Sequence, residues 1–210
     1  MEITWLGHSC FRIRGNKTTI ITDPYSSEGG ETSLKLTADV VTVSHQDAGH
    51  SYVQGVTGSP KLITGPGEYE IGGVLILGIA TYHDNVGGAE RGKNTIYLMK
   101  VDEISLLHCG DLGHMLNAAT IEEIGGVDVL FVPVGNKTTI GAATAAELVR
   151  RLEPKVVIPM HYPAKNMDTD LEPADKFLKE VGVKEITPQP KLSITKSKLP
   201  LTTQVVLLNI

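Results

Sequence analysis

The chain lacks the features that mark disulfide-rich secreted proteins and membrane proteins. It has only two cysteines among 210 residues, Cys10 and Cys109, which are too few for a disulfide framework, and we expect no bridge between them. No apolar run is long enough to cross a bilayer. The first ten residues, MEITWLGHSC, contain no basic segment followed by an apolar core, so no signal peptide is expected. The expectation is a soluble cytoplasmic protein with no membrane partner.

The chain also lacks an excess of positive charge. Its formal net charge is −5 and its isoelectric point is near 5.8, so it has no basic footprint for nucleic acid. A nucleic-acid substrate held by a metal ion stays open, but a small-molecule or phosphodiester substrate is expected. With 41% apolar residues, the chain is predicted to form a single domain over residues 1–210.

Strands dominate the first half of the chain. Short β-branched segments cover residues 3–15 and 17–24, and Gly15-Asn16 between them is a hairpin signal. Further strands are expected within four more segments, residues 39–45, 61–83, 94–102 and 104–111.

From about residue 115, helical patterns alternate with buried strands. Helices are expected within residues 115–125, 141–154 and 170–182. Buried strands are expected over residues 128–135 and 155–163, and a final strand pair within residues 191–210. Strand meanders followed by β–α units favour an α/β (α+β) protein in which helices cover β-sheets in layers.

Most apolar runs end in residues that can take part in chemistry. Five such residues stand at or just beyond the end of a run: Asp23, His45, His83, Asp111 and His161. Strand ends are places where a sheet can bring distant side chains together on a rigid base. Zinc takes imidazole nitrogens and carboxylate oxygens as ligands, and a catalytic site keeps one position for water. The sequence therefore predicts a divalent-metal site at one edge of a sheet.

The segment SHQDAGH, residues 44–50, carries three of the candidate ligands. In an extended chain, His45 and Asp47 would point the same way because they are two residues apart. His50 could return to the same place through a turn, which Gly49 makes easy. In a competing interpretation, the Asp47 carboxylate caps the turn or the next helix.

Several motifs together resemble a known family. SHQDAGH resembles a degraded form of the His-x-His-x-Asp-His motif of the metallo-β-lactamase-fold hydrolases. The later elements match in order: ATYHD with His83, HCGDLGH with Asp111, and VIPMHY with His161. WLGHSCF, TIITDP, GPGEYEIGG and DVLFVPVG also resemble the small bacterial and archaeal branch of metal-dependent hydrolases, so the resemblance covers nearly the whole chain. It implies a four-layer αββα sandwich with a site for one or two divalent metals at one edge.

Two positions depart from the family motif. Asp47 stands where the motif has its second histidine, and Gly49 where it has its aspartate. The resemblance implies a first metal held by His45, Asp47 and His83, and a second held by His50 and His161, with Asp111 bridging the two. Zinc is the expected metal, although the hard oxygen of Asp47 moves the preference toward manganese or iron. The second site loses a carboxylate and is expected to bind more weakly.

The expected reaction is metal-assisted hydrolysis of an ester, amide, lactone or phosphodiester. A metal lowers the pKa of a bound water from about 15.7 toward about 7, which gives hydroxide at neutral pH. Asp111 would hold the metal and orient this water. Candidate proton donors to the leaving group are His8, His114, Glu68 and Tyr162. The alternative is a non-catalytic metal- or ligand-binding module on the same fold, with a site eroded by the changes at Asp47 and Gly49.

Other polar residues have simpler interpretations. Asp23 is expected to end a strand and brace the site from behind its ligands, and His108 to be hydrogen-bonded in the core. Asn94 and Arg91 fit a solvated loop as well as a pocket lining. Three polar segments are expected to form the loops around the pocket: SSEGGETS, HDNVGGAERGKN and PAKNMDTDLEP.

Overall fold

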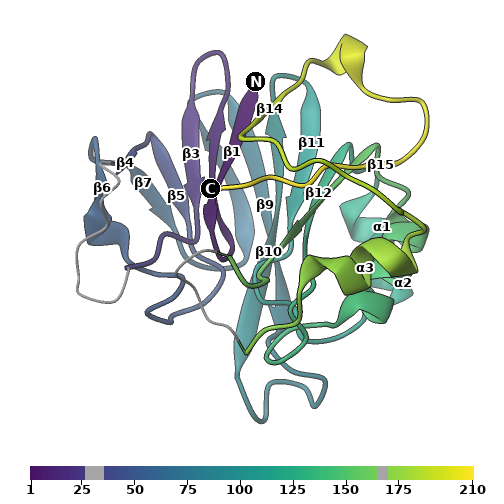
Figure 1. Cartoon of the computed structure of the whole chain (residues 1–210). Helices are drawn as coiled ribbons and strands as arrows, with labels where there is room; N and C mark the ends of the chain where they lie inside the picture. Colours follow the sequence, from purple (N-terminus) through teal and green to yellow (C-terminus); the bar gives the residue numbers. More distant parts are fainter. Residues whose placement is uncertain (27–35, 165–169) are drawn as a thin grey trace.

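Two β-sheets pack against each other, and α-helices lie outside the second sheet (Figure 1). The structure is a computed structural model that describes residues 1–26, 36–164 and 170–210. Of the predicted pocket loops, HDNVGGAERGKN lies within the described residues. All of SSEGGETS except its first residue and the middle of PAKNMDTDLEP lie outside them.

The first sheet has six strands in the order β14-β1-β2-β3-β5-β7. Their bounds are β1 Glu2–Gly7, β2 Cys10–Arg14, β3 Thr19–Thr22, β5 Val40–Thr42, β7 Lys61–Ile63 and β14 Leu192–Ser193. Strand β2 is antiparallel to both β1 and β3, while β5 is parallel to β3. Strands β1, β3 and β5 therefore end at the same edge of the sheet. The hairpin predicted at Gly15-Asn16 is confirmed as the β2–β3 connection.

The second sheet has seven strands in the order β15-β13-β12-β11-β10-β9-β8. Their bounds are β8 Gly67–Ile71, β9 Val74–Tyr82, β10 Lys93–Val101, β11 Ile104–His108, β12 Val129–Pro133, β13 Val156–Met160 and β15 Gln204–Val205. Strand β10 is antiparallel to β9 and β11, and β12 and β13 run parallel to β11. Strands β9, β11, β12 and β13 therefore end at one edge.

The three predicted helices are confirmed as α1 Ala118–Ile124, α2 Ala142–Leu152 and α3 Ala174–Glu180. Helix α2 packs on β12, and α3 packs on β13 and on α2. The side chain of Asn117 caps α1 by accepting a hydrogen bond from the Thr120 N–H at 2.9 Å. Within the described part of the chain, no helix is long and apolar enough to cross a membrane.

The outer face of the first sheet has a different cover. A small parallel pair, β4 (Leu36–Thr37) and β6 (Val56–Thr57), adjoins the 3₁₀ helix η1 (Val53–Gly55). A second 3₁₀ helix, η2, spans Lys196–Lys198 near the C-terminus. All three α-helices in the described residues follow β11 in the sequence, and the layer over the first sheet is built from strands and turns.

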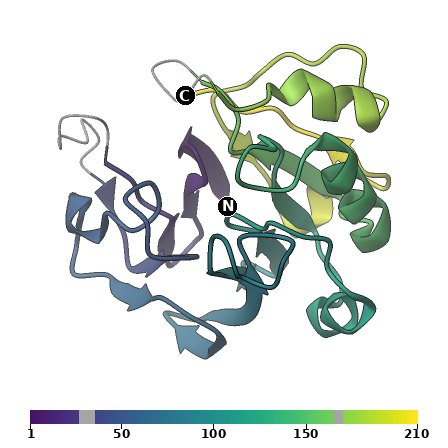
Figure 2. The same cartoon turned by 90° about the horizontal axis from the view of Figure 1, so that it is seen from below.

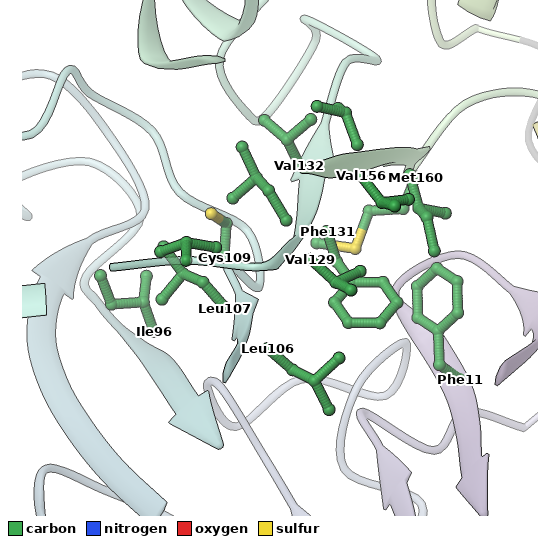
Figure 3. Packing of buried hydrophobic residues seen from close by; sticks show 14 of the residues in the cluster. Phe11, Ile96, Leu106, Leu107, Cys109, Val129, Phe131, Val132, Val156 and Met160 are labelled. Carbon is green, nitrogen blue, oxygen red and sulfur yellow. The ribbon is translucent and has the colours of Figure 1, made fainter. Parts of the chain in front are cut away.

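The core lies between the two sheets because strand side chains alternate between faces. Ile20 and Val40 enter the main apolar cluster, whereas their neighbours Ile21 and Val41 enter a smaller one on the other face of the first sheet. Phe11 and Phe131 meet in the main cluster with ring centroids 4.6 Å apart (Figure 3). The predicted α/β architecture of layered sheets and helices is confirmed.

The C-terminal segment corrects one prediction. The strand pair expected within residues 191–210 does not form, because β14 pairs with β1 and β15 pairs with β13. Each short strand completes the free edge of a different sheet, so the tail joins the two sheets. Apolar alternation predicts a strand but does not select the edge that accepts it.

Candidate metal centre

The ends of strands from both sheets meet at one end of the molecule. This is the end from which the β9–β10 loop projects at the bottom of Figure 1, and Figure 2 views the molecule from that side. Four polar residues directly follow a strand: His8 after β1, Asp23 after β3, His83 after β9 and His161 after β13. His45 and Asp111 each stand three residues beyond a strand, β5 and β11 respectively.

The backbone turns sharply as it leaves several of these strands. His8, Asp23 and His161 have positive φ angles of 46°, 38° and 55°. Residues with a side chain rarely adopt this left-handed conformation, which is found mainly where surrounding contacts enforce it. A Cβ atom at Gly135 would collide with the carbonyl oxygen of His161. Glycine at this position therefore lets the loop after β12 lie directly against the turn that carries His161.

Three imidazoles converge on one carboxylate oxygen. The Oδ2 atom of Asp111 lies 3.3 Å from Nε2 of His50, 3.2 Å from Nε2 of His83 and 3.2 Å from Nε2 of His161. Atoms that share a metal at about 2.0–2.2 Å lie about 3 to 3.5 Å from one another. The spacing around Asp111 is therefore the spacing of neighbouring ligands on a common metal.

The convergent side chains form two groups that share Asp111. The first group is His45, His83 and Asp111, and the second is His50, Asp111 and His161. Within each group the potential ligand atoms lie within 4.8 Å of one another. Two imidazoles and one carboxylate match the three protein ligands of a catalytic zinc site and also suit non-haem iron.

Unpartnered atoms support the fit to a divalent metal. In the described structure, Nε2 of His83 is buried and has no hydrogen-bond partner although it faces Asp111. Nδ1 of His161 is also buried without a partner. A buried polar nitrogen without a hydrogen bond is costly, and coordination of a metal by His83 would remove that cost.

Asp23 braces the second group from behind. Its Oδ2 atom accepts a hydrogen bond from Nδ1 of His50 at 3.0 Å. In the neutral imidazole this bond places the proton on Nδ1 and leaves the lone pair of Nε2 directed toward Asp111. The result agrees with the sequence expectation that Asp23 supports the site rather than binding metal.

Asp23 also reaches the first group through Ser44. The Ser44 backbone N–H and hydroxyl donate to the Asp23 carboxylate at 2.7 Å and 2.6 Å. Because the single hydroxyl proton points at Asp23, Oγ of Ser44 can only accept from Nδ1 of His45, 3.0 Å away. The lone pair of a neutral His45 is therefore on Nε2, so one buried carboxylate sets the tautomers of two candidate ligands.

The electrostatic environments of His45 and His50 shift their pKa values in opposite directions. Burial and the neighbouring His50 lower the pKa of His45 below its usual value. Burial alone would lower the pKa of His50 as well, but Asp111 and Asp23 on its two sides raise it well above 6.5. Burial alone would raise the pKa of Asp111, but His161 and His50 hold it well below its usual value.

Asp47 lies at the rim of this arrangement. Residues 44–50 form bends and turns instead of an extended segment, so strand alternation does not direct Asp47 to the same side as His45. The exposed Asp47 carboxylate accepts a hydrogen bond from the Gly49 N–H at 2.8 Å, which caps the turn. The turn does bring His50 back, with ring centroids of His45 and His50 4.4 Å apart. A ligand role for Asp47 stays a prediction.

The two groups lie in the wall of a pocket of about 240 Å³. This volume is below the roughly 300 to 1,000 Å³ typical of ligand pockets, so the pocket suits a small molecule. Its lining consists of His8, His45, Asp47, Gly49, His50, His83, Asp111, Lys137, Thr138, His161 and Leu171. Of the predicted proton donors, His8 therefore lies beside the candidate ligands.

The other predicted proton donors lie away from the pocket lining. Both ring nitrogens of His114 contact the backbone, with Nε2 accepting from Tyr82 N–H at 3.2 Å and Nδ1 2.9 Å from the Met115 carbonyl. The Tyr162 hydroxyl donates to the Leu208 carbonyl at 3.2 Å. Glu68 is an exposed residue of the edge strand β8. Catalytic roles for His114, Glu68 and Tyr162 have no support from this arrangement and stay predictions.

The core histidine behaves as expected. His108 is fully buried, its Nε2 lies 2.8 Å from the Ser9 carbonyl, and its Nδ1 accepts from Gly110 N–H at 3.3 Å. The prediction that His108 is hydrogen-bonded in the core is confirmed. Cys10 and Cys109 are separate buried thiols, and burial raises the pKa of both.

Two residues support the turn and the carboxylate of Asp111: Asn94, for which a pocket lining and a solvated loop were both open, and Ser9, which the sequence did not single out. Asn94 is buried, and its Oδ1 accepts from the Asp111 N–H at 3.0 Å while its Nδ2 donates to the Cys109 carbonyl at 3.0 Å. It fixes the turn that carries Asp111. Ser9 donates its hydroxyl to Oδ1 of Asp111 at 3.3 Å. Their only sequence signal was a position beside a strand end, which many structurally unimportant residues share.

Asp84 organises the loop after His83. Its two carboxylate oxygens accept four backbone N–H groups, from Val86, Gly88, Glu90 and Arg91, at 2.7–3.0 Å. Burial alone would raise the pKa of Asp84, but these four donors lower it to about 2. The carboxylate therefore shapes the β9–β10 loop as a unit that begins at a candidate ligand.

Comparison with known proteins identifies the family of this chain. Residues 2–161 match the β-lactamase superfamily domain. A UPF0173 metal-dependent hydrolase from Rhizobium johnstonii is 32% identical over 240 residues, covering 92% of this chain and all of the relative. A second one, from Geobacillus sp., is 29% identical over 196 residues, with 77% of this chain and 85% of the relative covered.

Solved structures agree with these relatives. A crystal structure from Thermotoga maritima, assigned to the Zn-dependent hydrolases of the metallo-β-lactamase superfamily, superposes with a TM-score of 0.82 and 39% identity. The superposition covers 99% of this chain and 98% of that one. The chain belongs to the metallo-β-lactamase superfamily, among the metal-dependent hydrolases.

Proposed function

We propose that this protein hydrolyses a small ester, amide, lactone or phosphodiester with the help of one or two divalent metals. The observation that carries the proposal is the convergence of three histidine Nε2 atoms on Oδ2 of Asp111, at 3.2–3.3 Å, in the wall of a small pocket. Zinc is the first expectation for the metal, with manganese and iron as alternatives. A bound divalent metal would activate water and polarise the scissile group.

The chain's own residues would divide the work. His45, His83 and Asp111 would hold one metal, and His50, His161 and Asp111 the other. Asp111 would orient the attacking water, because Ser9 and Asn94 fix its carboxylate and its backbone. His8 would hold a proton for the leaving group from its position in the pocket lining.

The first test measures metal content. Protein purified without chelator or metal-affinity resin is analysed for bound metals, and the ratio of metal to protein is determined. About two metals per chain are expected for the wild type, and fewer for His161→Ala. Gln46→Ala is the matched control because Gln46 is exposed beside His45. A wild-type chain that takes up no zinc, manganese or iron on titration would refute the proposal.

The second test measures turnover. Chromogenic esters, lactones and phosphodiesters are screened with added zinc, manganese or iron. Metal-dependent hydrolysis that chelation abolishes, and that His161→Ala lacks, is the expected result. Metal binding without turnover of any substrate would favour the non-catalytic module, an alternative that the exposed position of Asp47 and the glycine at position 49 keep open.

A further inference from the structure

The pocket beside the candidate metal groups has one cationic side chain that the metal arrangement does not use. Lys137 is the only lysine or arginine among the described residues that line this pocket. It lies in the loop after β12, next to Thr138, which also lines the pocket. The whole protein is acidic, with a net charge of −5, so a lysine here is not part of a general positive surface.

The loop that carries Lys137 is held in place from several directions. Gly135 and Gly141 form a β-bridge across its base. The Gly135 carbonyl accepts N–H groups from Glu172 and Lys137 at 2.9 Å and 2.8 Å. At the far end, Ile140 N–H donates to the Leu112 carbonyl at 2.8 Å, next to Asp111. Lys137 therefore has a fixed attachment point beside the pocket.

The ammonium group of Lys137 already contacts a carboxylate that a ligand could replace. Its Nζ atom lies 2.9 Å from Oδ2 of Asp170. Both side chains are largely solvated, 47% and 72% exposed. Exposed ion pairs contribute little stability because water screens them and both side chains lose freedom. An anion in the pocket can therefore compete with Asp170 for this charge.

We propose that Lys137 selects substrates that carry a second, anionic group, a carboxylate or a phosphate, apart from the bond that is cleaved. The inference rests on the proposed hydrolase function and specifies its substrate class. An ammonium group binds either anion as a point charge, and Thr138 adds a hydroxyl donor at the same wall. Asp170 would hold Lys137 near this position in the absence of substrate.

The first experiment needs no turnover. Metal-loaded protein is reductively methylated in the presence of succinate or of the neutral, non-hydrolysable butane-1,4-diol, at matched ionic strength, and each lysine is quantified by peptide mass spectrometry. Succinate should slow methylation of Lys137 at least about threefold, while butane-1,4-diol should not. Lys179 and Lys191, both exposed elsewhere, are the internal controls. Equal rates at Lys137 with both compounds would overturn the inference. Repeating the experiment with a phosphomonoester tests the other anion.

The second experiment uses two variants with opposite expected effects. Lys137→Gln should raise KM at least about tenfold for a nitrophenyl ester bearing a free carboxylate, and change KM less than about twofold for nitrophenyl acetate. Asp170→Asn removes a carboxylate that competes for Lys137 and should lower KM for the charged ester about two- to fivefold. If the Lys137–Asp170 ion pair had only a structural role, both variants would lose activity with both esters. That result would overturn the inference.

The two proposals can fail separately. If the wild type hydrolyses neither ester but succinate protects Lys137, the anion site stands and ester hydrolysis fails. If both esters are hydrolysed and Lys137→Gln affects them equally, the hydrolase stands and the anion site fails.

Discussion

The two candidate metal groups share Asp111 but differ in burial. Every member of the His50–Asp111–His161 group is buried, whereas His45 and His83 are half-buried. The protein also braces them differently. His50 contacts the carboxylate of Asp23 directly, whereas Asp23 reaches His45 only through a serine hydroxyl. The second group is therefore the more buried and the more directly braced of the two.

The more buried and braced group is not the one that binds metal more easily at neutral pH. A proton competes with a metal for the same imidazole lone pair. The raised pKa of His50 means that the second group must release a proton when it binds a metal near neutral pH. The lowered pKa of His45 leaves this ligand of the first group deprotonated there. We therefore expect the first group to bind metal more tightly at neutral pH, in agreement with the motif-based expectation.

The largest expected effect comes from removing the shared ligand. Asp111→Asn should weaken metal binding at both groups by more than about 100-fold, since even residues behind a ligand contribute about 10- to 100-fold. Metal titration with elemental analysis measures it. His45→Ala and His50→Ala, which each belong to one group, should each lose one metal. Retention of two tightly bound metals by Asp111→Asn would contradict the shared role.

The next effect separates the two groups. Asp23→Asn should weaken metal binding by about 10- to 100-fold at the second group, because the Nδ1 proton of His50 loses its carboxylate partner. Ser44→Ala should weaken the first group more than the second, because its hydroxyl contacts His45 directly and reaches His50 only through Asp23. Spectroscopic titration with cobalt shows whether the two groups fill in separate phases, and therefore which of them has lost affinity. A larger loss at the first group than at the second in Asp23→Asn would reverse the comparison.

A smaller effect concerns the loop of the first group. Asp84→Asn replaces one accepting oxygen with an N–H donor that faces backbone N–H groups, so about half of the loop's hydrogen bonds should be lost. We expect faster amide exchange in residues 84–92 and metal affinity at the first group lower by about tenfold. Glu90→Gln, an exposed acid in the same loop, is the control. Unchanged exchange would show that the carboxylate does not organise the loop.

The smallest effect is a pH dependence of the metal-free protein. The folded-state pKa of His50 lies well above the unfolded value of 6.5, so its contribution to stability is complete below that pH and is lost as pH rises through the folded-state pKa. Above pH 6.5 the lowered pKa values of His45 and His108 no longer change stability. The Tm of chelator-treated protein should therefore fall by a few degrees as pH rises above 6.5.

Two controls complete the pH experiment. Metal-loaded protein should show the opposite trend, because metal binding is favoured when His50 loses its proton. The variant His50→Gln should lose the decline in metal-free Tm. A metal-free Tm that rises steadily above pH 6.5 would show that another group dominates.

The periodic elements and many of the candidate ligands could be read from the chain. The strand endings at Thr22, Thr42, Tyr82 and Met160 were visible because apolar runs stop there and polar residues follow. The turn at Gly49 that returns His50 to His45 was also predictable from local chemistry. The pairing of β14 and β15 was not, because it depends on which sheet edges remain free.

The residues that support the site were the least predictable. Asn94 and Asp84 act through backbone groups that meet them only after two strands and a loop have folded. Asp47 was placed beside His45 by assuming an extended chain, and the bends of residues 44–50 instead direct its carboxylate to its own turn.

The sequence by itself determined the order of strands and helices, the strand-end positions of the histidines and the family, because these depend on local periodicity and on motifs in a fixed order. Only the tertiary structure decided that Asp111 faces three histidines, that Asp23 sets the protonation of two of them and that Lys137 lines the same pocket. These relations join segments far apart in the chain, and side-chain direction at a strand end depends on backbone turns that no local pattern specifies.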